Sequence, residues 1–224
     1  MKFTRYATCL MAVMFMSACA SYTPVREKTS YYVLEYPPPI TKSLDTLDVA
    51  VKVSRFNIAA LYNSLPMVYR ADAFERNTYA YHLWREPPTD MVRDLLIRDL
   101  RASGAFRLVL RSDTDAEARF RLEGDIEEFY ELDQKETWSA VFTAVMTLLD
   151  EEAQDVTRLV LFQRSYTEQQ ICAEKRPKAV VLAMSQAVQA FSAAFIPELH
   201  AAVKRRLAED SSDRHVSKVP GNPR

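Results

Sequence analysis

The residue best placed to do chemistry in this sequence is Cys19, whose thiol directly follows the small residues Ser17 and Ala18. A short basic segment and the apolar run 6–16 precede them. That run is much shorter than the roughly 20 residues that a transmembrane helix needs. A basic start, a short apolar run and small residues before the cleavage point are typical of an export signal. The sequence therefore predicts a signal peptide over residues 1–18, with cleavage between Ala18 and Cys19.

The tetrapeptide Met16-Ser17-Ala18-Cys19 resembles the bacterial lipobox, in which the thiol is acylated and becomes the first residue of the mature chain. Residues 20–28 are mostly polar and contain a proline, so they offer no core in which a cysteine could be buried. Two or three acyl chains, at about 0.8 kcal/mol per buried methylene, would hold the protein on a membrane. Two other interpretations stay open, an ordinary cysteine near a secretory cleavage site and an uncleaved anchor.

The residue after the lipidation site bears on which membrane holds the protein. In lipoprotein sorting as it is generally understood, an aspartate there favours retention in the inner membrane, and this chain has Ala20. We therefore expect the outer membrane, on its periplasmic face, in a host with two membranes.

Charge and cysteine content exclude several classes of protein. Removing residues 1–18 takes away two basic residues, which leaves 27 basic against 30 acidic residues. This balance does not indicate a nucleic-acid binder, which normally has a basic face. Outside the signal and Cys19 only Cys172 remains, so no intrachain disulfide is expected. We expect Cys172 to be a small buried residue and not a reactive thiol.

No group of side chains has the spacing of a catalytic or metal site. His82, His200 and His215 are far apart in the sequence, and the chain has only 3 glycines, which argues against a phosphate-binding loop. The carboxylates between residues 123 and 128 fit the solvated face of an amphipathic strand better than an acid/base pair. The sequence thus predicts no enzyme, no metal and no cofactor beyond the covalent lipid on Cys19.

One apolar segment stands out as a candidate contact surface. Residues 55–66 lose the period-two pattern but keep large side chains, among them Phe56, Leu61 and Tyr62. An apolar loop that no core covers is typical of an interaction site. We take these three residues and Tyr69 as candidate partner contacts, while packing into the core stays open as the alternative.

Alternation of apolar and polar residues predicts the strands that position these side chains. The clearest patterns cover residues 47–54 and 118–127, and a bulge at Glu127-Glu128 would keep Phe129 inward. Trp84 and Tyr81 are expected to pack into the core. Segment 137–149 fits a helix almost as well, but its β-branched residues favour a hairpin with 156–166. Further strands are expected at 30–36, as an edge strand, and at 67–70, 79–84 and 106–110.

Two helices are expected. The first follows a double proline, with Thr89 as a candidate N-cap and Gly104 as its C-terminal stop. The second begins at Pro177 with apolar residues at three- and four-residue steps, and Pro197 should kink or break it. The polar tail 209–224 is predicted to be disordered.

These elements predict a single α+β domain over residues 30–208, with a mostly antiparallel sheet and two main helices packed on one face. Residues 19–29 would form the lipid anchor and linker.

The order of several short motifs resembles the ABC-type transport auxiliary lipoprotein component family, which includes the lipoprotein of the paraquat-inducible (Pqi) system. After the lipobox, the matching segments are Tyr31-Tyr32-Val33-Leu34, Met67-Val68-Tyr69-Arg70, Trp84 with Pro87, the helix over 91–100, and Ala183-Met184-Ser185-Gln186-Ala187. The likeness covers residues 31–207.

The resemblance implies a non-enzymatic periplasmic component anchored in the outer membrane. Its implied partners are a mammalian-cell-entry (MCE) domain protein and an inner-membrane ABC permease and ATPase, which together move lipid or other hydrophobic cargo. Only Cys19 carries over as a functional residue, and a homo-oligomer is allowed but not decided by the sequence. Two alternatives stay open: an accessory factor for barrel assembly or peptidoglycan synthase activation, and direct binding of cargo in a cavity under the helices.

Overall fold

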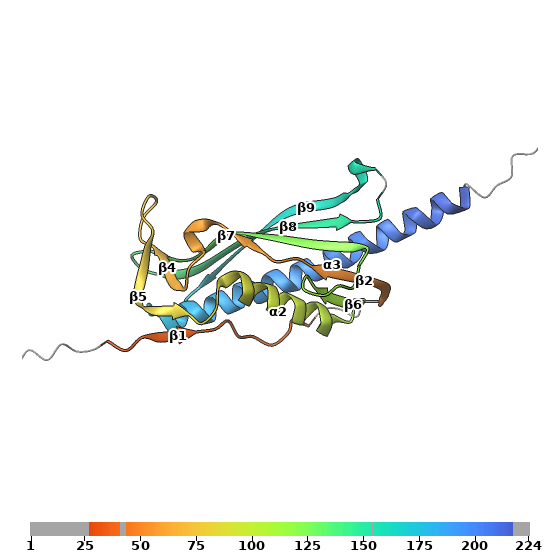
Figure 1. Ribbon diagram of the computed structural model, residues 1–224. Coiled ribbons are helices and arrows are strands. Elements are labelled where there is room, and N and C mark those ends of the chain that lie inside the picture. The colour runs from red at the N-terminus through yellow and green to blue at the C-terminus, as the bar shows by residue number, and fades with distance from the viewer. Residues whose placement is uncertain (1–26, 41–43, 154, 217–224) are drawn as a thin grey trace, which may run out of the picture.

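The protein is a single α+β domain in which a curled sheet lies on one side and two helices lie on the other (Figure 1). The computed structural model describes residues 27–40, 44–153 and 155–216. The helices are α2 (Pro88–Ser103) and α3 (Pro177–Val216). This architecture confirms the predicted fold class. The predicted signal peptide and the lipidation site Cys19 lie outside the described residues.

The described part of the chain forms nine strands. Their bounds are β1 Ser30–Tyr32, β2 Leu47–Val53, β3 Asn57–Ile58, β4 Pro66–Arg70, β5 Asn77–Trp84, β6 Phe106–Arg111, β7 Phe120–Asp133, β8 Trp138–Asp150 and β9 Val160–Ile171. The hairpin of β8 and β9 confirms that 137–149 is a strand. β1 lies at a border of the sheet as expected, but it ends at Tyr32 and not at the prolines.

Strand β7 organises the sheet. One of its edges pairs with β8 along its whole length, from Phe120 opposite Asp150 to Asp133 opposite Trp138. Its other edge is shared in turn by β2, β3 and β4, all parallel to it. The chain from residue 51 to residue 70 therefore runs alongside β7 in the same direction.

The pairing directions divide the sheet into two parts. The long ladders β7–β8 and β8–β9 are antiparallel, as the hairpin pattern predicted. The short pairings of β1 with β5, of β6 with β2, and of β2, β3 and β4 with β7 are parallel. These parallel pairings join segments distant in sequence, so local patterns gave no sign of them.

The predicted bulge in β7 is present. The register with β8 shifts between Ile126 and Glu128, and Phe129 is buried on the inner face. An extra residue in one strand restores the alternation after two successive polar positions. The bulge thus keeps the second half of β7 facing the helices.

Helix α2 begins differently from the prediction. Pro87 is the N-cap and makes no side-chain capping bond, so Thr89 already lies inside the first turn. Pro88 is the first helical residue, where the fixed φ of proline fits the helix start and its missing N–H has no partner anyway. The end is as predicted, since Gly104 adopts the left-handed conformation with φ of 64°.

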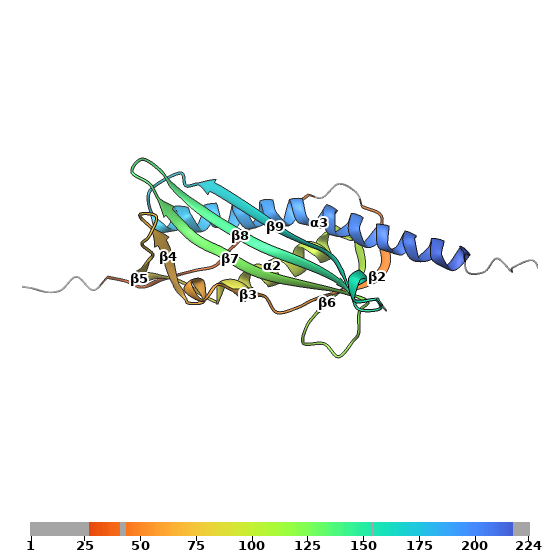
Figure 2. The same ribbon diagram turned by 90° about the horizontal axis from the view of Figure 1, so that it is seen from above.

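Helix α3 continues through Pro197 without a break and reaches Val216, so the first part of the predicted disordered tail is helical. Packing of α3 on β8 and β9 supports the turn that proline weakens, because Phe195, Ile196 and Leu199 around it are buried. In Figures 1 and 2 the C-terminal part of α3 projects beyond the end of the sheet.

The core lies between the sheet and α3. A chain of aromatic contacts crosses it, with ring centroids 5.3 Å apart for Trp84 and Phe129, 6.4 Å for Phe129 and Phe142, and 5.3 Å for Phe142 and Phe191. Large side chains therefore fill the layer between the sheet and α3. This packing argues against the hypothesis that cargo binds in a cavity under the helices.

Candidate functional site

The apolar segment 55–66 lies along β7 and not free in solvent. The amide of Ser54 donates to the carbonyl of Leu122 at 2.8 Å, and the amide of Ala59 donates to that of Ile126 at 2.9 Å. The segment is held there because β2 before it and β4 after it pair with the same edge of β7.

This course places two of the predicted contact residues in the core. Phe56 and Tyr62 are buried, and the ring of Tyr62 stacks on Tyr130 with centroids 5.9 Å apart. The prediction that they face a partner is therefore wrong for the folded chain, and the alternative of core packing holds. Leu61 is 52% exposed, so it remains available for contact.

A glycine in β7 makes room for Phe56. A Cβ placed on Gly124 would lie 2.8 Å from three atoms of the Phe56 ring, closer than real Cβ contacts. The close packing of this ring against the strand backbone explains why a glycine stands in the middle of a long strand.

Gly124→Ala is expected to lower the free energy of unfolding by about 1–3 kcal/mol, because the added methyl overpacks a filled site. Urea denaturation followed by the fluorescence of the two tryptophans measures the change. The double variant Gly124→Ala/Phe56→Leu should lose less than the two single losses combined, because the smaller side chain accepts the methyl. Strict additivity would show that the two residues do not share this contact.

The predicted aromatic cluster divides between core and surface. Trp84 is buried as expected, whereas Tyr81 is exposed, so its prediction as a core residue is wrong. Tyr69 is half-buried, and its ring lies 4.9 Å from that of Tyr79. Tyr69 therefore contributes mainly to packing within the sheet.

Tyr79 donates hydrogen bonds to the carboxylate of Glu131, whose burial the sequence did not indicate. Glu131 is 1% exposed and accepts hydrogen bonds from the Tyr79 hydroxyl at 3.0 and 2.9 Å. Burial raises the pKa of Glu131 to about 7, although the bond from Tyr79 opposes the shift. Burial, with a smaller effect of Glu131, also raises the pKa of Cys172 to about 11, so this thiol is protonated at neutral pH.

Glu131→Gln is expected to stabilise the protein at pH 8 by about 1–3 kcal/mol and to change little at pH 5. The pKa of Glu131 is about 7 in the folded protein and about 4.3 in the unfolded chain. The neutral carboxyl therefore contributes its full stability below about pH 4.3, and this contribution is lost as the pH rises through 7. Glutamine keeps a polar partner for Tyr79 without a charge. Denaturation midpoints at both pH values test this, with the exposed Glu127→Gln as control; equal effects of Glu131→Gln at both pH values would contradict it.

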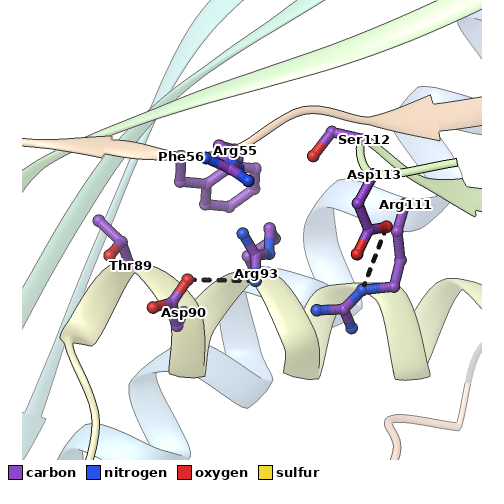
Figure 3. Close-up of a pocket in the computed structure, with 8 residues that line it drawn as sticks. All are labelled: Arg55, Phe56, Thr89, Asp90, Arg93, Arg111, Ser112 and Asp113. Atoms are coloured by element: carbon purple, nitrogen blue, oxygen red, sulfur yellow. Dashed lines mark ion pairs between the residues drawn. The ribbon is translucent and has the colours of Figure 1, made fainter.

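A polar hollow of about 430 Å³ lies beside the first turns of α2 (Figure 3). Arg55, Arg93 and Arg111 reach it from three different segments. Arg93 contacts Asp90 at 3.1 Å, and Arg111 contacts Asp113 at 3.9 Å. Arg111 also contacts Asp94 of α2 at 3.0 Å, so an ion pair joins α2 and β6 beside the hollow.

The segment that follows the linker is clamped between the two helices. The Tyr36 hydroxyl donates to buried Asp99 of α2 at 2.9 Å, and the Tyr36 carbonyl accepts from Arg98 at 2.8 Å. On the other side, the Glu35 amide donates to the Ser185 hydroxyl of α3 at 3.1 Å. This clamp fixes the path of the chain at Glu35 and Tyr36.

An apolar groove of about 600 Å³ lies next to this clamp. Val33 from the clamped segment and Leu182 from α3 line it, and both are exposed. The groove therefore adds apolar surface next to the clamped segment.

Four charged side chains are brought together at the far end of β7 and β8. Asp150 is fully buried and accepts from Arg119 at 2.9 and 2.7 Å and from Arg206 of α3 at 2.8 Å. Asp210 contacts both arginines, with 2.6 Å between its Oδ1 and Nη1 of Arg206. This cluster attaches the second half of α3 to the sheet.

Two further questions are whether the described residues hold a metal site and whether α3 could cross a membrane. Within the described ranges, no three His, Cys, Asp or Glu side chains come together as a metal site. Helix α3 is long and apolar enough to cross a membrane, but 56% of its apolar window is buried against the rest of the domain. Its apolar residues thus build the core.

The comparison with protein families identifies this architecture. The model of the ABC-type transport auxiliary lipoprotein component family matches residues 32–195, from the end of β1 to the middle of α3. The chain belongs to this family. The family match confirms the resemblance that the short motifs indicated. The family is one of lipoproteins associated with ABC-type transport.

Solved structures share the fold of this family member. Protein XCC0632 from Xanthomonas campestris has a TM-score of 0.72 at 18% identity, and the match covers 80% of this chain and 99% of that chain. The hypothetical protein CT253 from Chlamydia trachomatis has a TM-score of 0.50 at 12% identity, with coverage of 70% and 98%. At these identities the likeness is one of fold. No curated relative matches the chain.

Proposed function

We propose that the protein is a lipid-anchored component on the periplasmic face of the outer membrane and serves an MCE-type transport system. In this role it contacts an MCE-domain protein that works with an inner-membrane ABC permease and ATPase to move lipid or other hydrophobic cargo. Membership of the ABC-type transport auxiliary lipoprotein family is the observation that carries the proposal. The role is non-catalytic and needs no cofactor beyond the lipid on Cys19.

The shape of the domain supports a tethered connector. The described chain begins at one end of the elongated domain, and α3 projects at the opposite end (Figure 1). Forty residues of helix span about 60 Å. A domain held by its first residues thus extends well away from the anchor.

Leu61 is the predicted contact residue that stays exposed, so the test is centred on it. A photo-crosslinking amino acid at position 61 of the full-length protein should capture an MCE-domain protein in living cells, identified by mass spectrometry. The same amino acid at Leu108 on β6 is the matched control, because both leucines are 52% exposed.

Capture of the MCE-domain protein at position 61 but not at 108 would support this contact. Recovery of a barrel-assembly protein or a peptidoglycan synthase would instead favour the alternative role as an accessory factor of that machine. A crosslinking experiment over the whole surface of the protein that recovers no transporter subunit and no MCE subunit would contradict the transport role.

A further inference from the structure

Strand β9 ends the sheet with a long open edge. It has 12 residues and pairs with β8, and the described part of the chain places no strand on its other side. In Figure 2 it forms the border of the sheet, with α3 beneath it. An edge of this length presents a row of unpaired N–H and C=O groups that can pair with another strand.

The edge of β9 has a register shift beside Leu161 and carries the charged residues Arg164 and Glu168, but it lacks other features that usually prevent such pairing. It contains no proline and no lysine, and its outward row, which includes Gln163, Ser165, Thr167 and Gln169, carries no charge. The border strand β6 differs, since Arg101 donates a hydrogen bond to its Val109 carbonyl at 2.9 Å. Natural edge strands are commonly protected by charges, prolines or covering groups. The β9 edge is therefore suited to contact.

The sequence of β9 is nearly symmetric about Tyr166. Four of the five pairs of residues equally distant from it are similar or complementary: Ser165 with Thr167, Arg164 with Glu168, Gln163 with Gln169, and Leu161 with Ile171, whereas Phe162 with Gln170 is not. A two-fold symmetric interface requires a self-complementary surface, because every contact between residue i of one copy and residue j of the other occurs a second time with the copies exchanged.

We propose that β9 pairs antiparallel with β9 of a second copy of this chain, with the two-fold axis at Tyr166. The two sheets then form one continuous sheet, and each dimer carries two lipid anchors.

The charges of β9 favour this register. Glu168 is half-buried, and its carboxylate makes no hydrogen bond or ion pair with the described residues. Arg164 contacts Glu198 of α3 from the same strand face. In the dimer each Glu168 lies opposite Arg164 of the second copy, and opposite charges in facing positions stabilise a strand pair.

The helix beneath the edge leaves space for a second copy. Glu198 of α3 reaches β9, since it also accepts from the Tyr166 hydroxyl at 2.8 Å. Ala194 and Ala201, four residues before and three after it, lie on the same helix face and are exposed. These small side chains allow α3 of each copy to approach the other.

Disulfide crosslinking tests the register in the full-length protein in its membrane. Two differently tagged copies are co-expressed with Cys172 replaced by alanine, one with Gln163→Cys and the other with Gln169→Cys, and an oxidant is added. Opposite residues lie about 5 Å apart at Cβ, so this pair should link efficiently. Two Gln163→Cys copies should not link, because the two positions are six residues apart along the pair, about 20 Å.

The charge pairs provide the second variant set. Adding Glu168→Arg to the linking pair should lower its yield roughly five-fold or more, because arginine then faces Arg164 twice per dimer. Adding Arg164→Glu as well should restore most of the yield. Linking of Gln163→Cys to itself, absence of the Gln163–Gln169 link, or linking of either cysteine to another protein instead would overturn the proposal.

Discussion

Cys19→Ala is expected to remove all covalent acyl label from the protein and to deplete it from the outer-membrane fraction. Lipidation needs the thiol, and two or three acyl chains supply nearly all of the membrane affinity at about 0.8 kcal/mol per methylene. The described domain, which begins beyond the linker, should keep its fold. Incorporation of a clickable palmitate analogue, with membrane fractionation, measures the first effect, and protease resistance in spheroplasts measures the second.

The matched control is Cys9→Ala, which removes a thiol inside the predicted signal peptide and should leave both label and fractionation unchanged. If Cys19→Ala also blocks cleavage of the signal peptide, the variant should migrate as a precursor larger than the mature wild-type protein. Retention of the acyl label would disprove Cys19 as the lipidation site, and loss of protease resistance would show that the anchor is needed for folding.

Asp150→Ala is expected to lower the free energy of unfolding by about 3–5 kcal/mol, because it leaves two largely buried guanidinium groups without their shared carboxylate. Asp150 is fully buried between Arg119 and Arg206, with contacts of 2.7 and 2.8 Å. The loss should concentrate in the second half of α3, which Arg206 attaches to the sheet. Urea denaturation gives the total, and amide exchange along α3 locates it.

The effect of Asp150→Ala should depend on pH. Burial opposes ionisation of Asp150, but hydrogen bonds from Arg119 and Arg206 outweigh it and hold its pKa below the usual range. A lowered folded pKa contributes stability above the unfolded value of about 3.9 and loses it as the pH falls through the folded pKa. The difference between wild type and variant should thus be full at pH 7 and should shrink as the pH falls below about 3.9.

Glu152→Ala is the control for this cluster, since Glu152 lies 3.7 Å from Arg119 but its side chain is 69% exposed. A surface pair of this kind contributes about 0–1 kcal/mol. Equal losses for Asp150→Ala and Glu152→Ala would contradict a special role for the buried carboxylate.

Much of the architecture could be predicted because it is encoded locally. Alternation identified β2 and β7, the polar doublet Glu127-Glu128 identified the bulge, and Gly104 marked the end of α2. Each of these signals depends on a side chain and its immediate neighbours, so no knowledge of distant contacts was needed.

The apolar segment 55–66 shows where such reasoning ends. Its irregular pattern indicated a free surface, but pairing of β2 and β4 with the same edge of β7 holds it in place and buries Phe56 under Gly124. Arg206 is a second example, because Asp150, distant in sequence, draws it into a buried cluster.

By itself the sequence determined the α+β class and the family and predicted an export signal and a lipidation site, because these depend on residue types in order along the chain. The tertiary structure decided which apolar residues stay exposed, where Glu131 and Asp150 are buried, and that the self-complementary row of β9 lies on an open edge. Burial and strand neighbours arise from long-range pairing, and the period of a single segment does not specify its partner.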